Sequence, residues 1–169
     1  MNHIVLFEPE IPQNTGNIIR TGASFNCKVH IIKPMGFSFD EKALKRASMD
    51  YINLSEIFFH DSLDDFIKDI DINDLHILTR YGKKPISSAN IKDVTKDYYF
   101  LFGRESSGLP RDFLLKHPSN LYRIPMRPEA RSLNLANTVA IALYEAIKQQ
   151  DYFSLATQEE IKGSDFLGD

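Results

Sequence analysis

The sequence is poor in cysteine, and Cys27 is the single one among 169 residues. One thiol cannot form an intramolecular disulfide, and alone it cannot supply the cysteine cluster of a zinc site. No apolar run approaches the roughly 18 residues that span a bilayer. The first eight residues, Met-Asn-His-Ile-Val-Leu-Phe-Glu, have no basic segment, and their apolar run is too short for a signal peptide. We therefore expect a cytoplasmic protein that is not bound to a membrane.

Several common catalytic and cofactor motifs are also missing. No Gly-x-Gly-x-x-Gly follows the first apolar run, and there is no Gly-x-Ser-x-Gly nucleophile elbow. Gly103 and Gly108 have the spacing of a P-loop, but Leu109-Pro110 occupies the place of the required Lys-Ser/Thr. The histidines lack metal-ligand spacing, so we assign no metal. They are His3, His30, His60, His76 and His117.

The composition is that of an ordinary globular protein, with 43% hydrophobic and 25% charged residues. We expect one domain over residues 1–150 and a tail over residues 151–169. The net charge of −3 is unevenly divided, because residues 80–131 carry eleven Lys/Arg but five Asp/Glu. A basic half on an acidic protein favours an anionic ligand such as RNA. An uneven but merely solvated surface is the alternative.

Short apolar runs predict β-strands at residues 3–7, 28–32, 54–59, 75–79, 98–102 and 121–124. The first two runs flank a helical pattern, and strand, helix and strand within about thirty residues form a βαβ unit with a right-handed crossover. We therefore predict an α/β fold with a single open, mostly parallel sheet flanked by helices.

Helix boundaries are marked by capping residues. Asn14 or Thr15 is expected to cap the first helix, and Asp61-Ser62 a helix over residues 63–70. Further helices are predicted over residues 40–48 and 110–115. The last helix carries an apolar face at i, i+4 spacing and ends near Gln149. Its cap candidates are Ser132, Asn134 and Asn137.

Polar clusters follow three of the apolar strands. They occupy residues 14–20, 103–108 and 124–134. In an open α/β sheet, ligands bind beyond the carboxyl ends of the strands. We therefore expect the three clusters to converge on one site.

In this order, the clusters resemble the three motifs of the SPOUT RNA methyltransferases. They read Asn-Thr-Gly-Asn-Ile-Ile-Arg at 14–20, Phe-Gly-Arg-Glu-Ser-Ser-Gly-Leu-Pro at 102–110, and Ile-Pro-Met with Arg-Ser-Leu-Asn between 124 and 134. Within that superfamily, Glu-Pro-Glu-Ile-Pro-Gln-Asn-Thr-Gly-Asn at 8–17 and Pro-Met-Gly-Phe at 34–37 are similar to the TrmL (YibK-type) tRNA wobble-nucleotide 2′-O-methyltransferases.

The resemblance implies a trefoil knot in the C-terminal half, a homodimer, and S-adenosylmethionine bound in the knot. Backbone groups at the strand ends would hold its adenine. The residues implied for the cofactor pocket are Leu78, Thr79, Gly103, Ile124, Met126, Ser132 and Leu133.

A ribose 2′-hydroxyl is a poor nucleophile, so its proton must be removed or strongly hydrogen-bonded as the methyl group approaches. The resemblance gives this role to Arg20, either as the base or as a group that positions the phosphate or the hydroxyl, since arginine is normally fully protonated. It assigns orientation of Arg20, the cofactor or the ribose to Asn14, Glu105, Ser132 and Asn134. Tyr144 either closes the pocket or is a core aromatic.

Each of these residues also has a structural explanation. Asn14 can be a helix cap, Arg20 a surface side chain, and Glu105 the partner of a neighbouring arginine. Their order at three strand ends favours a shared site.

We therefore predict an S-adenosylmethionine-dependent methyltransferase that modifies the 2′-oxygen of the wobble nucleotide of tRNA, cytidine or a modified uridine. The expected RNA contacts are Lys83, Lys84 and Arg104. A ribosomal RNA ribose methyltransferase and a catalytically idle knotted RNA-binding protein are the alternatives.

Overall fold

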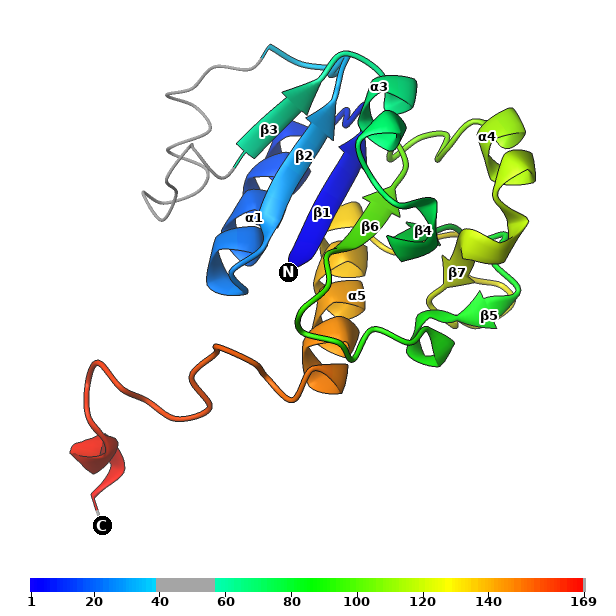
Figure 1. Ribbon diagram of the computed structural model, residues 1–169. Coiled ribbons are helices and arrows are strands. Elements are labelled where there is room, and N and C mark those ends of the chain that lie inside the picture. Colours follow the sequence, from blue (N-terminus) through cyan, green and yellow to red (C-terminus); the bar gives the residue numbers. More distant parts are fainter. Residues whose placement is uncertain (39–56, 169) are drawn as a thin grey trace.

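The computed structural model describes residues 1–38 and 57–168. This part of the chain forms a seven-stranded sheet in the order β3-β2-β1-β6-β4-β7-β5, and every neighbouring pair of strands is parallel (Figure 1). The predicted single parallel sheet is confirmed. Its strands are β1 (Asn2–Phe7), β2 (Lys28–Ile32), β3 (Ile57–His60), β4 (Leu75–Leu78), β5 (Lys84–Pro85), β6 (Tyr98–Phe102) and β7 (Leu121–Arg123).

Strand β1 lies between β2 and β6, and all six of its residues are buried. A parallel strand covered on both faces needs apolar side chains on both, which explains its unbroken Ile-Val-Leu-Phe run. Successive side chains point to opposite faces. Ile4 and Leu6 therefore join one core cluster, and Val5 and Phe7 join the other.

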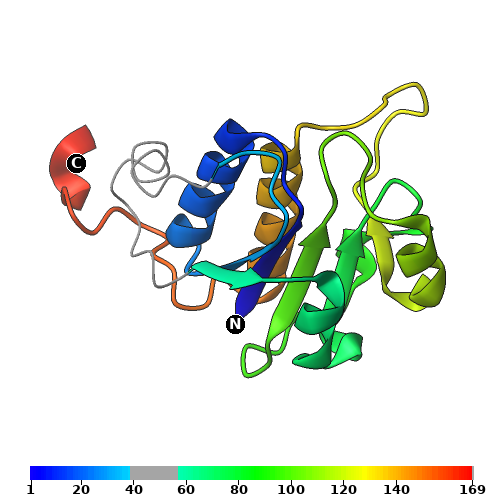
Figure 2. The same cartoon turned by 90° about the horizontal axis from the view of Figure 1, so that it is seen from above.

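Helices cover both faces of the sheet. Figure 2 shows α1 (Pro12–Ser24) and α5 (Leu135–Gln149) side by side on one face, with α3 (Leu63–Lys68) and α4 (Arg111–Lys116) on the other. The predicted apolar face of the last helix is confirmed, since Val139, Leu143 and Ile147 are buried. Short 3-10 helices span Ile72–Asp74, Ile86–Ser88, Pro118–Asn120 and Ser164–Leu167. No helix in the described ranges has the length and apolar character to cross a membrane.

Some predicted boundaries need correction. Neither Asn14 nor Thr15 caps α1, because the helix begins at Pro12, where a proline fits the first turn. Ser62 does cap α3, accepting a hydrogen bond from the Asp65 N–H at 3.1 Å. The helix predicted over 40–48 and the first residues of the strand predicted over 54–59 lie outside the described residues. The basic segment between β4 and β6 contains the short strand β5, which the sequence analysis missed.

The segment after α5 extends away from the sheet (Figure 1). Near its start, the hydroxyl groups of Tyr144 and Tyr152 are 3.4 Å apart. Further on, Ile161, Phe166 and Leu167 are 95%, 84% and 90% exposed. The division into a domain over residues 1–150 and a tail remains a prediction.

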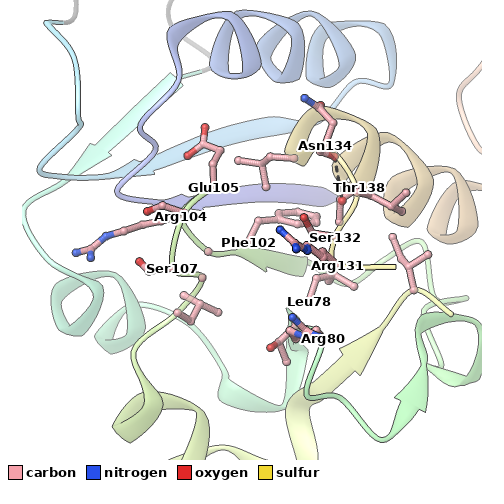
Figure 3. Close-up of a pocket in the computed structure, with 18 of the residues that line it drawn as sticks. Leu78, Arg80, Phe102, Arg104, Glu105, Ser107, Arg131, Ser132, Asn134 and Thr138 are labelled. Atoms are coloured by element: carbon pink, nitrogen blue, oxygen red, sulfur yellow. Dashed lines mark hydrogen bonds between the residues drawn. The ribbon is translucent and has the colours of Figure 1, made fainter. Parts of the chain in front are cut away.

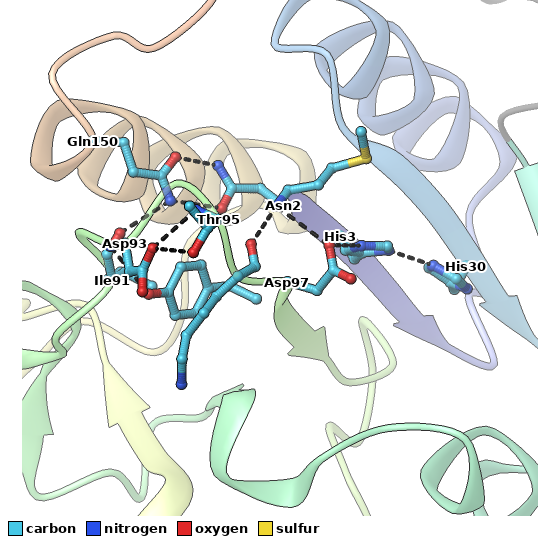
Figure 4. A network of polar contacts seen from close by, with 11 residues as sticks. Asn2, His3, His30, Ile91, Asp93, Thr95, Asp97 and Gln150 are labelled. Carbon is cyan, nitrogen blue, oxygen red and sulfur yellow. Dashed lines mark hydrogen bonds and ion pairs between the residues drawn. The ribbon is translucent and has the colours of Figure 1, made fainter.

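A pair of amides joins the first strand to the last helix (Figure 4). Asn2 donates to Gln150 at 2.9 Å, and Gln150 donates back to Asn2 at 3.0 Å. Gln150 also lies 3.0 Å from the carbonyl of Ile91, so it joins α5 to the segment before β6. The buried amide of Asn2 and the half-buried amide of Gln150 thus satisfy one another.

A row of histidines crosses β1, β2 and β3, and Figure 4 shows the part of it from Asp97 through His3 to His30. Nδ1 of His3 lies 2.9 Å from Nε2 of His30, whose Nδ1 lies 2.9 Å from Nε2 of His60. At the other end, Nε2 of His3 lies 3.3 Å from the carboxylate of Asp97. Three neutral rings satisfy this row if each donates from Nε2, with Asp97 as the last acceptor. Burial lowers the pKa of His3 and lowers that of His30 to about 3.

We predict that acid destabilises the protein through this row. The lowered pKa of His30 means that the unfolded chain binds a proton that the folded chain excludes between about pH 6.5 and about pH 3. The contribution of the row to the free energy of unfolding is therefore fully present above about pH 6.5. It is lost as the pH decreases, by up to about 1.4 kcal/mol per pH unit for each such imidazole. Urea titrations between pH 7.5 and pH 4.5 measure this slope.

The variant His30→Gln keeps a donor and an acceptor but removes the titration, and it is expected to flatten the slope. His117→Gln removes an imidazole that packs on Phe113 outside the row, and it serves as the matched control. Equal slopes in the wild type and His30→Gln would contradict the prediction.

Candidate functional site

The loops that follow β4, β6 and β7 line a cavity of about 600 Å³ together with the start of α5 (Figure 3). These loops leave the carboxyl edge of the sheet, where parallel strands direct the segments that follow them. Polar and apolar side chains both line the cavity, and the apolar ones include Leu78, Phe102, Ile124, Met126 and Leu133. The predicted convergence is therefore partial: residues 103–108 and much of 124–134 line the cavity, whereas the cluster at 14–20 contributes only Asn14.

Two carboxylates form hydrogen bonds that connect the loop after β6 to the loop after β1. Glu105 accepts hydrogen bonds from the backbone N–H groups of Glu10 at 2.9 Å and Ile11 at 3.1 Å. In return, Glu10 accepts from the backbone N–H of Ser106 at 3.0 Å and from its hydroxyl at 2.8 Å. Hydrogen bonds to a charged acceptor are worth about 1.5–3 kcal/mol each. The pair fixes the entry to α1 against the cavity wall.

Arg104, in the same loop as Glu105, contacts the end of β1 and the residue that follows it. Its guanidinium forms an ion pair with Glu8 and lies 5.2 Å from the ring centre of Phe7. Glu8 therefore neutralises part of the positive charge of Arg104, which the sequence analysis expected to contact RNA. An RNA contact by Arg104 remains a prediction.

Asparagine side chains connect the remaining two clusters. Asn134 donates to the side-chain oxygen of Asn14 at 3.0 Å, and Asn14 lies 3.5 Å from Glu105. The oxygen of Asn134 caps α5, accepting from the N–H groups of Ala136 at 2.9 Å and Asn137 at 3.3 Å. Asn134 is thus the cap among the three candidates. A chain of polar contacts therefore runs from the β6 loop through α1 to the start of α5.

The turn after β6 depends on two glycines. The backbone groups of Arg104 and Gly108 exchange hydrogen bonds of 3.1 and 3.0 Å. A Cβ on Gly103 would lie 2.4 Å from the carbonyl carbon of Gly108, so position 103 tolerates no side chain. Gly108 has a φ of +67°, a left-handed conformation, but the space around its Cα is open.

All seven residues predicted for the cofactor pocket line the cavity. Four of the five predicted catalytic residues do so as well, namely Asn14, Glu105, Ser132 and Asn134. Arg20 lies elsewhere, on the exposed side of α1, about 9 Å further along the helix axis than Asn14. Tyr144 is 52% exposed, which excludes its alternative role as a core aromatic.

The lysines predicted to contact RNA lie outside the cavity lining. Lys84 donates to the carbonyl of Ser119 at 2.8 Å, and its ammonium lies 4.5 Å from the ring centre of Tyr122. The sequence analysis did not single out Arg80, Arg123 and Arg131, which do line the cavity. Their positions directly after β4, at the end of β7 and before α5 were the available signal.

Comparisons with known proteins agree with this geometry. The profile described as "SpoU rRNA Methylase family" matches residues 1–144. A Bacillus subtilis (strain 168) protein named "Putative tRNA (cytidine(34)-2′-O)-methyltransferase" is 46% identical over 90% of this chain and 96% of its own length. A solved Bacillus anthracis structure is 44% identical, covers 94% of this chain and 100% of its own, and superposes with a TM-score of 0.87.

Two further structures bear on substrate and cofactor. One, described as showing "the 2-OH methylation of C/U34 on tRNA", is 38% identical with a TM-score of 0.79, over 90% of this chain and 97% of its own. An AdoMet-bound rRNA methyltransferase from Sinorhizobium meliloti is 25% identical with a TM-score of 0.72, over 87% of this chain and 56% of its own.

We predict that the two glycines of the turn respond differently to alanine. Gly103→Ala forces Cβ into backbone atoms and should lower the free energy of unfolding by about 3 kcal/mol. In Gly108→Ala the new Cβ meets no atom within 4 Å. The free energy of unfolding should fall by only about 1 kcal/mol, because a residue with a Cβ is strained in the left-handed conformation. Urea denaturation of both variants at pH 7.5 tests this order, and equal losses would show that the turn adapts freely.

Proposed function

The chain belongs to the SpoU rRNA methylase family, and from that premise we propose that it transfers a methyl group from S-adenosylmethionine to the 2′-hydroxyl of a tRNA wobble nucleotide. The target base is cytidine or a modified uridine. The cavity carries the proposal, because it unites residues from three clusters that are far apart in the sequence and resemble the methyltransferase motifs. The names of the relatives at 46% and 38% identity support the choice of tRNA position 34.

The cavity suits S-adenosylmethionine in size and lining. Its volume of about 600 Å³ falls within the range of about 300–1,000 Å³ that small-molecule sites occupy. The apolar side chains of Leu78, Ile124, Met126 and Leu133 suit a flat adenine. Thr79 and Gly103 at strand ends, and Ser132 in the loop before α5, supply backbone and hydroxyl groups for its polar edge. When bound, S-adenosylmethionine supplies an electrophilic methyl group.

The protein's own residues contribute orientation. Glu105, Asn14 and Asn134 are held by one another and by helix N–H groups, so the cavity wall is rigid before the RNA arrives. Rigid placement matters because bringing two reactants into line removes a large entropic part of the barrier. Ser132 lies in the same wall and can orient the ribose.

Arg20 acts on the 2′-hydroxyl in this proposal, either as its base or as a donor that holds it. Because Arg20 lies on the outer side of α1 rather than in the cavity lining, it needs a second copy of the chain to reach a ribose. We therefore propose a homodimer through the outer surface of α1 and α5. On α5 this surface exposes Ile141 at 45% and Tyr144 at 52%.

We further propose that residues 1–150 form one methyltransferase domain, that its C-terminal half is knotted, and that it acts in the cytoplasm. The resemblance of residues 102–110 and 124–134 to the SPOUT motifs supports the knot, and residues of both segments line the cavity.

The function is tested with purified protein, S-adenosylmethionine carrying a labelled methyl group, and total tRNA from a strain that lacks the gene. Nuclease digestion and mass spectrometry should place the label on the 2′-oxygen of nucleotide 34. Arg20→Ala should lower the rate by about 100-fold or more while tRNA affinity changes little. Transfer to ribosomal RNA but not to tRNA, in a parallel reaction, would identify ribosomal RNA as the substrate. Binding of RNA without any transfer would favour an idle binder.

The proposed dimer predicts that Ile141→Asp yields a monomer. A buried carboxylate at the contact between two apolar surfaces costs several kcal/mol unless it is paired. Sedimentation should show half the wild-type mass, with an unchanged far-ultraviolet circular dichroism spectrum. Lys148→Asp, at the end of the same helix, is the control and should remain dimeric. A wild-type chain that sediments as a monomer would refute the dimer.

A further inference from the structure

Three guanidinium groups line the cavity without an acidic partner. They belong to Arg80 in the loop after β4, Arg123 at the end of β7, and Arg131 in the loop before α5. No carboxylate within the described ranges forms an ion pair with any of them. Glu105 also lines the cavity, but its oxygens are directed at the N–H groups of Glu10 and Ile11. The cavity therefore carries an excess of positive charge.

The neighbouring cations differ in this respect. Arg104 is paired with Glu8, and Arg127 lies 3.9 Å from Glu129. Lys84 donates to a carbonyl and to the hydroxyl of Tyr122. Arg80, Arg123 and Arg131 are thus cations of the cavity lining that no carboxylate in the described ranges neutralises.

Arg123 provides a second observation that points to a binding site. Its Nε is buried and has no hydrogen-bond partner in the described structure, although the rest of the residue is half-buried. A buried donor without an acceptor costs about 1–3 kcal/mol, and more when the group is charged. Such a cost is removed if a ligand brings an oxygen acceptor to this point.

The arrangement also indicates from where the ligand arrives. Arg80 and Arg131 are exposed, whereas Arg123 lies deeper, so an anion entering from solvent meets the first two before the third. Figure 3 shows Arg80 and Arg131 on the same side of the cavity, near Leu78, while Arg104 points away on the other side. Guanidinium groups present paired N–H donors that match the oxygens of a phosphate.

We propose that Arg80, Arg123 and Arg131 bind an RNA phosphodiester next to the ribose that receives the methyl group. This inference rests on the proposed function and names the contacts that hold its substrate. Phosphate contacts fix the register of a nucleic acid on a protein without reading its bases. Held at this edge of the cavity, the phosphodiester positions the neighbouring 2′-hydroxyl at the cofactor.

Arg80→Gln and Arg131→Gln test the proposal, with Arg127→Gln as the matched control. The control removes the same charge from the loop of Arg131, but from a guanidinium outside the cavity lining. The affinity for tRNA is measured at several salt concentrations in the absence of cofactor, and the affinity for S-adenosylmethionine is measured by calorimetry. Each cavity variant should weaken tRNA binding about tenfold and reduce the salt slope by about 0.7, the value for one contact to a single strand.

Arg123→Lys keeps the charge but lacks the Nε donor, and it should weaken tRNA binding while urea denaturation confirms that it folds. Cofactor affinity should stay within about twofold of the wild type in all variants, because their target is RNA. Parallel loss of cofactor affinity would assign the arginines to the carboxylate of S-adenosylmethionine and overturn the proposal. Loss of tRNA affinity no greater than in Arg127→Gln would overturn it too.

Binding is measured without methyl transfer, so the two proposals can fail separately. A chain that binds RNA through these arginines but methylates nothing would overturn the proposed function alone. A chain that methylates nucleotide 34 equally well in all three cavity variants would overturn the phosphodiester site alone.

Discussion

The carboxylate of Glu105 makes the contact on which the rest of the site depends. Its oxygens accept hydrogen bonds from the backbone N–H groups of Glu10 and Ile11, immediately before α1 begins. These donors precede a proline-initiated helix that has no side-chain cap of its own, so the acceptor comes from another loop, 95 residues further along the chain. One carboxylate thereby completes α1, closes the cavity wall and holds Asn14 within reach of Asn134.

Charge around the cavity is divided between structure and recognition. The acidic side chains Glu8, Glu10 and Glu105 are engaged in contacts that hold the loops together. Because the carboxylates are used in this way, the arginines of the β4, β7 and α5 loops retain their positive charge toward solvent. A protein with a net charge of −3 can therefore present a locally cationic site to a polyanion.

Much of this architecture could be predicted from the sequence, because apolar runs and cap residues are local signals. The strands, the apolar face of α5 and the Asn134 cap are examples. The cofactor-pocket residues came from resemblance to a family. The partners of Glu105 could not be predicted, because the arginines near it in the sequence were equally possible partners. Its actual donors are backbone N–H groups that only folding brings near. The roles of Lys84 and Arg104 likewise depend on Ser119 and Glu8, which are distant in the sequence.

The amide pair between Asn2 and Gln150 has a consequence for synthesis on the ribosome. The two residues are separated by 148 positions, and β1 has β6 as a neighbour on one side. A nascent chain thus carries its first strand, which is entirely apolar between His3 and Glu8, long before either β6 or the end of α5 has emerged. Contacts so distant in sequence close slowly. A strand whose residues all become buried thus waits longest for its full set of neighbours, and in that interval its apolar side chains need protection from aggregation.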